Sequence, residues 1–258
     1  MRFFVTGHKG LLGKKIMKMV HDSGGEVLYD NDLDVTKEIY IPENTDVVIH
    51  CAAMTNVDGC ERERYEAWKV NVEGTVNVAN VCKEINAKMV LISTDYVLKP
   101  TNFYALTKLV AEEEAQKILQ NLLIVRTSTL YGYNGKEKDR PTFVTWVLSQ
   151  KENIKTVTDN ITHPTLIDDL VENIIKLLKE NRTGIVNVVG KDCISKHAFA
   201  DAIIKVFGLK VENEKIWSGQ LKNWIAKRPR RLKLQNSPGV ETHTVVEGLE
   251  IMKKQMEE

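Results

Sequence analysis

Three glycines at a fixed spacing directly follow the first strand-like segment and open the first helix-like one. They are Gly7, Gly10 and Gly13 in the stretch TGHKGLLG at residues 6–13. In such a turn the first glycine permits the sharp bend, the second lets the backbone approach a pyrophosphate, and the third lets helix and strand pack closely. The N–H groups of the first helical residues, Leu11 and Leu12 among them, add a partial positive charge that attracts phosphates. The stretch therefore predicts a dinucleotide-binding unit; its alternative is a glycine-rich turn without a ligand.

Short apolar segments alternate with longer amphipathic segments over the first two-thirds of the chain. The predicted strands cover residues 3–6, 26–29, 47–50, 89–93 and 122–126, and the predicted helices cover residues 11–23, 67–85 and 104–119. Strands that are apolar nearly throughout and separated by helices indicate a parallel sheet covered by helices on both faces. The fold class is therefore α/β, with a doubly wound parallel sheet.

The last third of the chain continues this plan less regularly. A helix is predicted at 168–180, a strand at 184–190 and a helix at 196–207, whereas residues 210–239 show no clear period. The closing helix at 245–256 is amphipathic and is expected at the subunit contact of a homodimer. We predict a sheet domain at 1–132, to which 157–190 return, and a small C-terminal substrate-binding lobe made of 133–156 and 191–258.

Composition excludes several classes of protein. The chain of 258 residues has 36 Lys and Arg against 35 Asp and Glu, a balance that a strongly basic nucleic-acid binder does not have. We therefore read the basic run at 222–233 as a solvated face or a loop that contacts a diphosphate. The longest apolar stretches are far shorter than the roughly 20 residues of a membrane-spanning helix, and the first residues lack a signal-peptide pattern. Four cysteines without a CxxC pair and six scattered histidines indicate reduced thiols, no metal site and a cytoplasmic location.

Asp30 follows the predicted second strand, at the place where a carboxylate bonds the adenosine ribose hydroxyls in dinucleotide-binding folds. A carboxylate there would repel a 2′-phosphate and therefore favours NAD. The nearby Lys9, Lys14 and Lys15 favour NADP instead. The choice between NAD and NADP stays open, and Asp30 is also compatible with an ordinary turn.

Tyr104 and Lys108 lie four residues apart, which places them one turn apart on the same face of a predicted helix. A free phenol has a pKa near ~10, and a neighbouring ammonium should lower this value toward the range useful for proton transfer. Thr94 ends the preceding strand, where open α/β sheets place ligand-contacting groups. Together the three residues predict a site that protonates a substrate carbonyl, although a capping threonine and a chance Tyr–Lys spacing remain alternatives.

These motifs together resemble the extended short-chain dehydrogenase/reductases, and within them the dTDP-4-dehydrorhamnose reductase family. The resemblance covers nearly the whole chain and is carried by TGHKGLLG at 6–13, LDVT at 33–36, HCAAMTNVDGCE at 50–61, VNVEGT at 70–75, ISTDYV at 92–97, YALTK at 104–108, RTSTLYG at 126–132, HPTLIDDL at 163–170 and RPRR at 228–231. LDVT, AAMTNVD and STDYV in combination are specific to this family. The resemblance implies a Rossmann fold that binds NAD or NADP.

The resemblance also implies a role for individual residues. Asp34 and Val35 would flank the adenine, Ala52 and Ala53 would line the cofactor, and Thr55, Val57, Thr94 and Thr129 would face a nucleotide-sugar substrate. Thr94, Tyr104 and Lys108 would be the catalytic residues, with Tyr104 protonating the oxygen formed at a 4-keto carbon and Lys108 also bonding the nicotinamide ribose. The implied activity is the reduction of a 4-keto deoxysugar, with dTDP-4-dehydrorhamnose as the expected substrate.

Two segments depart from the family pattern. Only residues 98–103 separate STDYV from Tyr104, where family members carry a longer substrate-covering loop, and Thr129 stands where the family has tryptophan. These departures keep two alternatives open. One is a non-catalytic dinucleotide-binding regulatory subunit that resembles that of methionine adenosyltransferase, against which the intact Thr94, Tyr104 and Lys108 argue. The other is a nucleotide-sugar epimerase, which would use the same residues without net cofactor consumption.

Overall fold

A parallel six-stranded sheet forms the centre of the computed structural model, which describes residues 1–133, 135, 141–221 and 224–258. The strands follow the order β10-β5-β4-β3-β1-β2, and every neighbouring pair is parallel. Their bounds are β1 Arg2–Thr6, β2 Glu26–Leu28, β3 Val47–His50, β4 Lys88–Thr94, β5 Leu122–Thr127 and β10 Gly184–Asn187. The predicted doubly wound fold is confirmed, and each predicted strand lies within two residues of its expected ends, apart from the longer predicted strand at 184–190.

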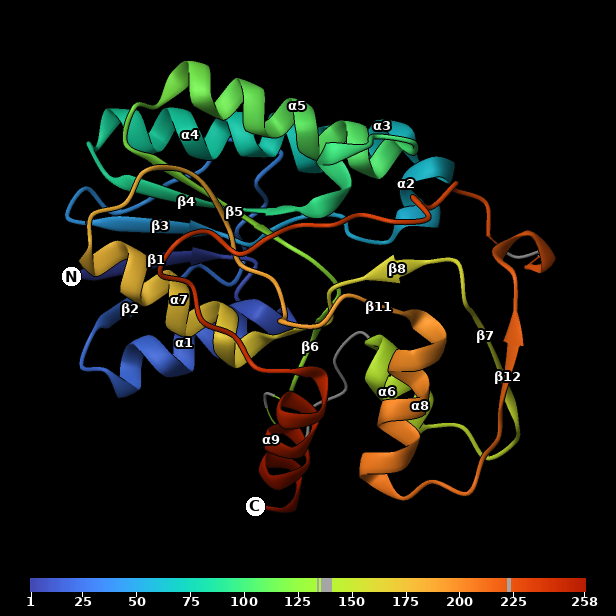
Figure 1. Cartoon of the computed structure of the whole chain (residues 1–258). Coiled ribbons are helices and arrows are strands. Elements are labelled where there is room, and N and C mark those ends of the chain that lie inside the picture. The colour runs from blue at the N-terminus through green and yellow to red at the C-terminus, as the bar shows by residue number, and fades with distance from the viewer. Residues whose placement is uncertain (134, 136–140, 222–223) are drawn as a thin grey trace.

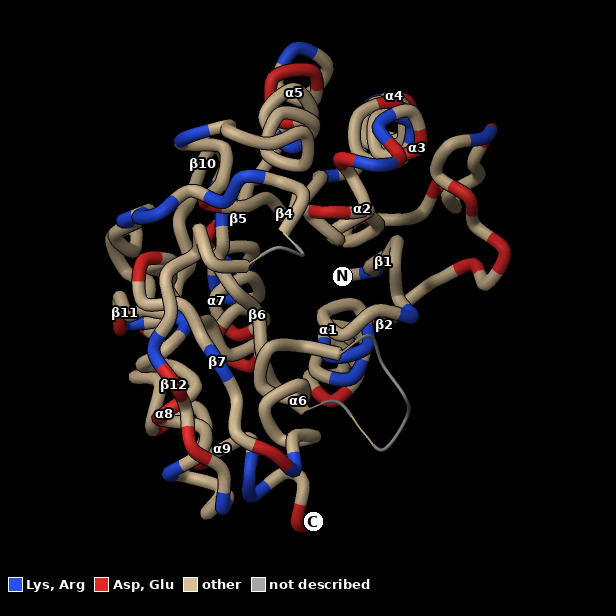
Figure 2. Tube along the Cα trace, turned by 90° about the vertical axis from the view of Figure 1, so that its right-hand side faces the viewer, with Lys and Arg blue, Asp and Glu red and all other residues tan. Residues whose placement is uncertain are grey.

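Helices cover both faces of this sheet (Figures 1 and 2). On one face lie α4 (Gly74–Glu84) and α5 (Phe103–Ile118), and on the other lie α1 (Leu11–Asp22) and α7 (Ile167–Lys179). Neighbouring strand residues point to opposite faces, so in β1 the buried Phe3 and Val5 join the core under α1 and α7, whereas Phe4 joins the core under α4 and α5. This two-sided burial explains why the strands are apolar nearly throughout.

The predicted helix at 67–85 is divided into three parts in the structure. A short helix α3 (Arg64–Trp68) leads into a π-helical turn η1 (Lys69–Glu73), and α4 follows. A π turn inserts a residue into the helix and is found mostly at functional positions. Here it contains the buried Asn71, whose amide bonds to the loop that follows β3.

A smaller lobe packs beside the carboxyl ends of the strands (Figure 1). Its buried centre joins α6 (Phe143–Leu148), α8 (Lys196–Phe207) and α9 (Val245–Glu257) around Phe199. The remaining elements are short: α2 Val57–Arg62, η2 Asp95–Leu98, β6 Leu130–Tyr131, β7 Ile154–Val157, β8 Ile161–Thr162, β9 Thr165–Leu166, β11 Ile194–Ser195, β12 Asn213–Ile216 and η3 Ser218–Gln220. In the lobe β7 pairs with β12 and β8 with β11, whereas β10 pairs with β5 of the large sheet and α7 packs in the core of that sheet.

The division at residue 132 and the return of 157–190 stay a prediction. Residues 134 and 136–140 of the predicted lobe segment, and residues 222–223 of the basic run, lie outside the described residues.

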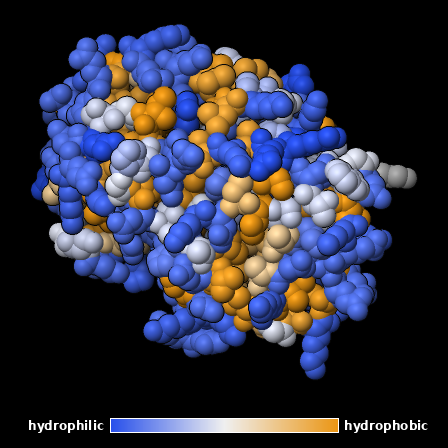
Figure 3. Space-filling view, viewed as in Figure 1, coloured by the Kyte–Doolittle hydropathy of each residue, from blue (hydrophilic) through white to orange (hydrophobic). Residues whose placement is uncertain are grey.

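The face shown in Figure 3 is hydrophilic over most of its area, with apolar patches between the hydrophilic residues. In the described part of the chain, none of the helices combines the length and the apolar character that crossing a bilayer requires.

Candidate active site

The carboxyl ends of β1, β3, β4 and β5 meet at one edge of the sheet, because these four strands are parallel neighbours. Gly7 follows β1, Ala52 follows β3 within two residues, and Thr94 ends β4. Thr94 pairs with Thr127 at the end of β5. Ligands of open α/β sheets bind at this edge, so the fold gathers at one place residues that are far apart in the sequence.

The glycine turn forms a close-packed cradle at this edge. Gly7 has a φ of +66°, and a Cβ there would lie 2.7 Å from the backbone nitrogen of Ala52. A Cβ at Gly13 would overlap the carbonyl oxygen of Gly7. Gly10 is the N-cap of α1, without a capping side chain and without an acidic residue in the first turn of the helix. The predicted pyrophosphate fits this cradle, because a bare backbone and a helix N-terminus face the ligand position.

A buried hydrogen-bond chain fixes the strand ends behind the cradle. Thr6 Oγ1 lies 2.7 Å from His50 Nδ1, and His50 Nε2 lies 3.1 Å from Thr75 Oγ1. The Ala52 N–H donates to Thr6 Oγ1 at 3.2 Å. Burial, and next the charge of Lys108, lower the pKa of His50 to about 3, so this ring is neutral at pH 7. His50 is therefore a structural residue that holds the loop after β3 against β1.

The end of β2 carries both acidic and basic groups. Asp30 is exposed, and one of its carboxylate oxygens accepts from the Asp32 N–H at 2.9 Å. The Lys9 ammonium donates to the Asn31 carbonyl at 2.8 Å, and the His8 ring packs against the Tyr29 ring in a tilted arrangement, 4.8 Å between ring centroids. The basic group Lys9 thus lies beside the predicted ribose position.

Lys15 does not lie at that position. It is buried and forms an ion pair with Asp168 of α7. The position of Lys15 in the first helix suggested a role at the ribose, but its side chain points toward α7 instead.

The residues predicted to flank the adenine and the substrate differ in exposure. Asp34 is exposed and accepts hydrogen bonds from the backbone and hydroxyl of Thr36, whereas Val35 is buried and packs against Gly74. Ala53 is half-buried in the loop after β3. In the same loop Thr55 is exposed, and Val57 begins α2. Their contacts with ligands stay a prediction.

The three predicted catalytic residues are brought together. Lys108 and the half-buried Tyr104 lie on α5, and Lys108 is 3% exposed. The Thr94 hydroxyl bonds to the Tyr104 phenol and acts to lower its pKa. The Lys108 ammonium donates to the Ile92 carbonyl of β4 at 2.8 Å. This arrangement can deliver a proton from the phenol to an oxygen that also contacts Thr94.

The expected lowering of the Tyr104 pKa is wrong for this structure. Burial raises the pKa of Tyr104 well above its usual range, and Asp95, Tyr96 and Cys60 add to the rise. The Lys108 ammonium donates to the Ile92 carbonyl, and the charge of Lys108 does not outweigh the effect of burial on the Tyr104 pKa. Burial also lowers the pKa of Lys108 to about 8, although Glu112 and Cys51 oppose this effect. Tyr104 is therefore a protonated acid across the neutral range.

Two buried contacts missed by the sequence analysis hold α5 in place. Arg126 Nη2 bonds to Glu112 Oε2 at 2.6 Å and Arg126 Nε bonds to the same carboxylate, which also accepts from Ser93. Asn71 donates to Thr107 Oγ1 at 3.0 Å. Glu112 lies four residues beyond Lys108, and this continued spacing on one helix face was the available signal.

A segment of the C-terminal region crosses near the short connection before α5. Asn102 Nδ2 donates to the Lys227 carbonyl at 2.9 Å. Asp58 accepts from the Ile225 and Ala226 N–H groups and from both terminal nitrogens of Arg228. This segment, at residues 225–228, thus contacts Asn102 of the connection and Asp58 of α2, whereas Leu98 of the connection stays exposed.

Thr129 has a φ of +37°, and its carbonyl accepts from the Thr165 N–H at 3.1 Å. Its hydroxyl contacts Thr162. A polar group therefore occupies the position where the resemblance leads one to expect an aromatic wall.

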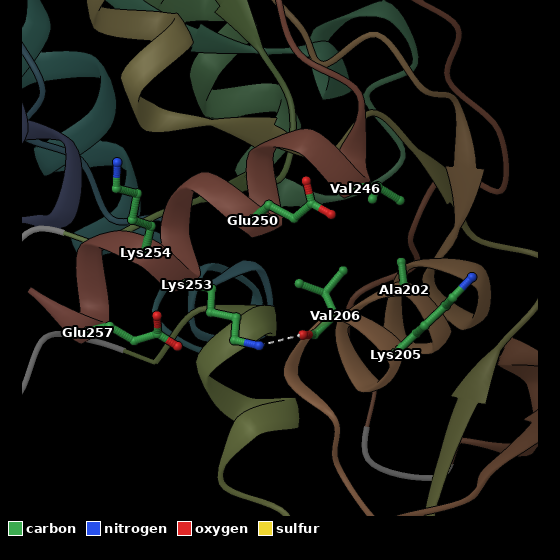
Figure 4. Close-up of a pocket in the computed structure, with 8 residues that line it drawn as sticks. All are labelled: Ala202, Lys205, Val206, Val246, Glu250, Lys253, Lys254 and Glu257. Atoms are coloured by element: carbon green, nitrogen blue, oxygen red, sulfur yellow. Dashed lines mark hydrogen bonds between the residues drawn. The ribbon is translucent and has the colours of Figure 1, made fainter.

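A separate groove of about 490 Å³ lies between the last turns of α8 and the face of α9 (Figure 4). Lys205, Lys253, Glu250 and Glu257 line it, and the Lys253 ammonium donates to the Val206 carbonyl at 3.1 Å. The groove is at the opposite end of α8 from Lys196, so it is not part of the strand-end site.

Comparison with known proteins agrees with this geometry. A family model described as RmlD substrate binding domain matches residues 1–247. The spore coat polysaccharide biosynthesis protein SpsK of Bacillus subtilis is 30% identical over 233 residues, covering 81% of this chain and 80% of the relative. The crystal structure of a dTDP-4-dehydrorhamnose reductase from Clostridium acetobutylicum superimposes with a TM-score of 0.91 at 29% identity, covering 100% of both chains. A dTDP-4-dehydrorhamnose reductase from Bacillus anthracis in complex with NADP gives a TM-score of 0.89 at 28% identity, covering 98% of this chain and 99% of that chain.

Proposed function

The chain belongs to the RmlD substrate binding domain family, and on this premise we propose that it reduces a dTDP-linked 4-keto-6-deoxy sugar, dTDP-4-dehydrorhamnose. The observation that carries the proposal is the assembly of Thr94, Tyr104 and Lys108 beside the glycine cradle. The relatives that superimpose over the full chain are named for this reaction. The intact trio argues against a purely regulatory subunit.

Each residue of the site has a separate role in the proposed reduction. Gly7, Gly10 and Gly13 would hold the pyrophosphate of the nicotinamide cofactor, which supplies a hydride to the C4 carbon when bound. The Thr94 hydroxyl orients the carbonyl oxygen, and the Tyr104 phenol donates its proton to that oxygen as the hydroxyl forms. The raised pKa of Tyr104 keeps this proton in place until the transfer.

We further propose that NADPH is the preferred cofactor. Lys9 is held at the end of β2 by its bond to the Asn31 carbonyl, where its ammonium can neutralise a 2′-phosphate. One oxygen of Asp30 is already engaged by the Asp32 N–H. The solved relative that carries NADP supports the same choice. We also propose that the enzyme is cytoplasmic and forms a homodimer through α9. A solution mass of twice the chain mass is expected, and a mass of one chain would contradict the homodimer.

A reductase assay tests both proposals. We expect dTDP-4-dehydro-L-rhamnose to oxidise NADPH, followed by the loss of absorbance of the reduced nicotinamide, with a higher kcat/KM than with NADH. Lys9→Met should reduce the NADPH preference and leave the NADH reaction nearly unchanged. An epimerase would interconvert sugars without net cofactor oxidation. Cofactor binding without turnover of any keto-sugar nucleotide would contradict the reductase function.

The pH dependence of kcat should report the Lys108 ammonium. Because the pKa of Lys108 is lowered to about 8, the charge is present below that pH and is lost above it. Loss of the charge removes support for the negative charge that forms on Tyr104 during proton transfer. We therefore expect kcat at saturating substrate to fall above pH 8, by about tenfold per pH unit. A profile that stays flat to pH 10 would show that Lys108 does not titrate in this range.

A further inference from the structure

A chain of hydrogen bonds leads from the catalytic threonine into the small lobe. Thr94 Oγ1 donates to Asp95 Oδ1 at 3.2 Å, and Ser128 Oγ donates to Asp95 Oδ2 at 2.7 Å. Ser128 Oγ also lies 2.9 Å from Thr162 Oγ1. Asp95, Ser128 and Thr162 are all buried. The chain therefore connects the reacting end of the sheet with β8 through groups shielded from water.

The chain ends at a lysine of the small lobe. Thr162 Oγ1 lies 2.5 Å from Thr129 Oγ1, and the Lys196 ammonium donates to Thr129 Oγ1 at 3.4 Å. Lys196 is half-buried, and its ammonium lies 4.7 Å from the centre of the Phe143 ring. Burial lowers the pKa of Lys196 to about 8, so the group is still mainly charged at pH 7. No carboxylate in the described ranges forms an ion pair with it.

An unpartnered imidazole nitrogen lies in the same region. His163 is 6% exposed, and its Nδ1 donates to the Gly190 carbonyl at 3.1 Å. Its Nε2 is buried and has no hydrogen-bond partner among the residues that the structure describes. His163 directly follows Thr162, which bonds to Ser128 and Thr129, and Lys196 also bonds to Thr129, so these residues belong to one region. We call Asp95, Ser128, Thr129, Thr162, His163 and Lys196 the polar cluster.

The unsatisfied groups of the polar cluster define the chemistry of a ligand. The Lys196 ammonium has three N–H donors and bonds to Thr129 Oγ1 through one of them, so it can take a further acceptor, whereas the His163 Nε2 of a neutral ring needs a donor. A buried polar atom without a partner is unfavourable. A hydroxyl group can accept from one and donate to the other, whereas a methyl group can do neither. A carboxylate would satisfy Lys196 but would lie beside the Asp95 carboxylate.

We propose that the polar cluster is a subsite for a sugar hydroxyl, in which Lys196 and His163 bind one ring hydroxyl of the keto sugar and thereby select the sugar. The proposal rests on the proposed reductase function, because the cluster is joined to Thr94. It makes Lys196 and His163 specificity-determining residues that act beside the catalytic trio.

A comparison of a lysine variant on natural and deoxy substrates tests this subsite. Lys196→Met keeps the length of the side chain and removes its charge, and Lys205→Met, an exposed lysine of the same helix, is the matched control. With dTDP-4-dehydro-L-rhamnose we expect Lys196→Met to lower kcat/KM by on the order of 10- to 100-fold, the effect of losing one charged hydrogen bond. With one of the two analogues, 2-deoxy or 3-deoxy, the wild type and Lys196→Met should have the same kcat/KM. An equal loss on all three substrates, or no loss on any, would overturn the proposal.

A second variant covers the case in which Lys196→Met does not fold. His163→Asn retains an N–H donor for the Gly190 carbonyl and lacks the Nε2 acceptor, so it should show the same dependence on one sugar hydroxyl.

Direct binding separates this proposal from the reductase function. The wild-type protein could turn over no keto sugar. In that case calorimetry with dTDP-L-rhamnose and its 2-deoxy and 3-deoxy analogues, in the presence of NADP⁺, still measures the Kd at the subsite. A Kd penalty of Lys196→Met that disappears with one deoxy analogue supports the subsite even then. If the wild type turns over the keto sugar and Lys196→Met has the same kcat/KM, the subsite is rejected and the reductase function is not.

Discussion

Replacing Tyr104 with phenylalanine is expected to lower kcat by on the order of 10²- to 10⁴-fold, the usual contribution of a positioned general acid. The variant keeps the ring that packs 6.0 Å from Tyr96 in an edge-on arrangement and loses only the hydroxyl beside Thr94. Steady-state kinetics with NADPH and dTDP-4-dehydro-L-rhamnose measure the loss. NADPH affinity, followed by quenching of protein fluorescence, should change little.

Tyr65→Phe is the control for this experiment, because Tyr65 is 66% exposed and lies outside the strand-end site. It should retain wild-type kcat. A Tyr104→Phe variant with nearly full activity would mean that another group donates the proton, and the assigned role of Tyr104 would be incorrect.

The second large effect concerns stability. Arg126→Met should lower the free energy of unfolding by about 3–5 kcal/mol, the cost of leaving a buried partner charge uncompensated. The side chain of Glu112 is 1% exposed, and that of Arg126 is 17% exposed. Loss of the guanidinium removes all three hydrogen bonds that it makes to the Glu112 carboxylate. Urea denaturation, followed by circular dichroism, measures the change.

A double substitution separates the lost pair from lost packing. Arg126→Met combined with Glu112→Gln removes the uncompensated charge, so it should recover much of the stability lost in the single variant. If the double variant is as unstable as the sum of the two single variants, the ion pair does not explain the effect. Arg2→Met is a matched control, because Arg2 forms an exposed pair with Glu26 and should change stability by less than about 1 kcal/mol.

The local sequence pattern was sufficient to predict the strands of the sheet and the glycine cradle. Apolar runs bounded by turn residues located the strands, because a parallel strand covered on both faces must be apolar at almost every position. The glycine spacing located the cradle, because Gly7 and Gly13 leave no room for a Cβ beside Ala52 and the Gly7 carbonyl. These features depend on neighbours in the sequence or on the repeating geometry of one strand.

Other features of the site could not be read in this way. The helix break at η1 depends on Asn71 bonding to Met54 and Thr107, which lie on other elements. The raised pKa of Tyr104 depends on burial by the surrounding fold, and the ion pair of Lys15 depends on where α7 packs. The spacing of residues along a helix predicted which side chains share a face of that helix. It did not predict which residue of another element each side chain contacts, as for Lys15 and Asp168.

The chain's order of strand, glycine turn and helix therefore determined the fold class, and it predicted the place of the cofactor and the roles of Thr94, Tyr104 and Lys108. The charge state of those residues and the polar cluster were decided by the tertiary structure, which joins Asp95, Ser128, Thr162, Thr129 and Lys196 by hydrogen bonds. The physical reason is the range of the interactions. Turn and strand geometry act over a few residues, whereas burial and hydrogen bonding join groups that the sequence keeps far apart.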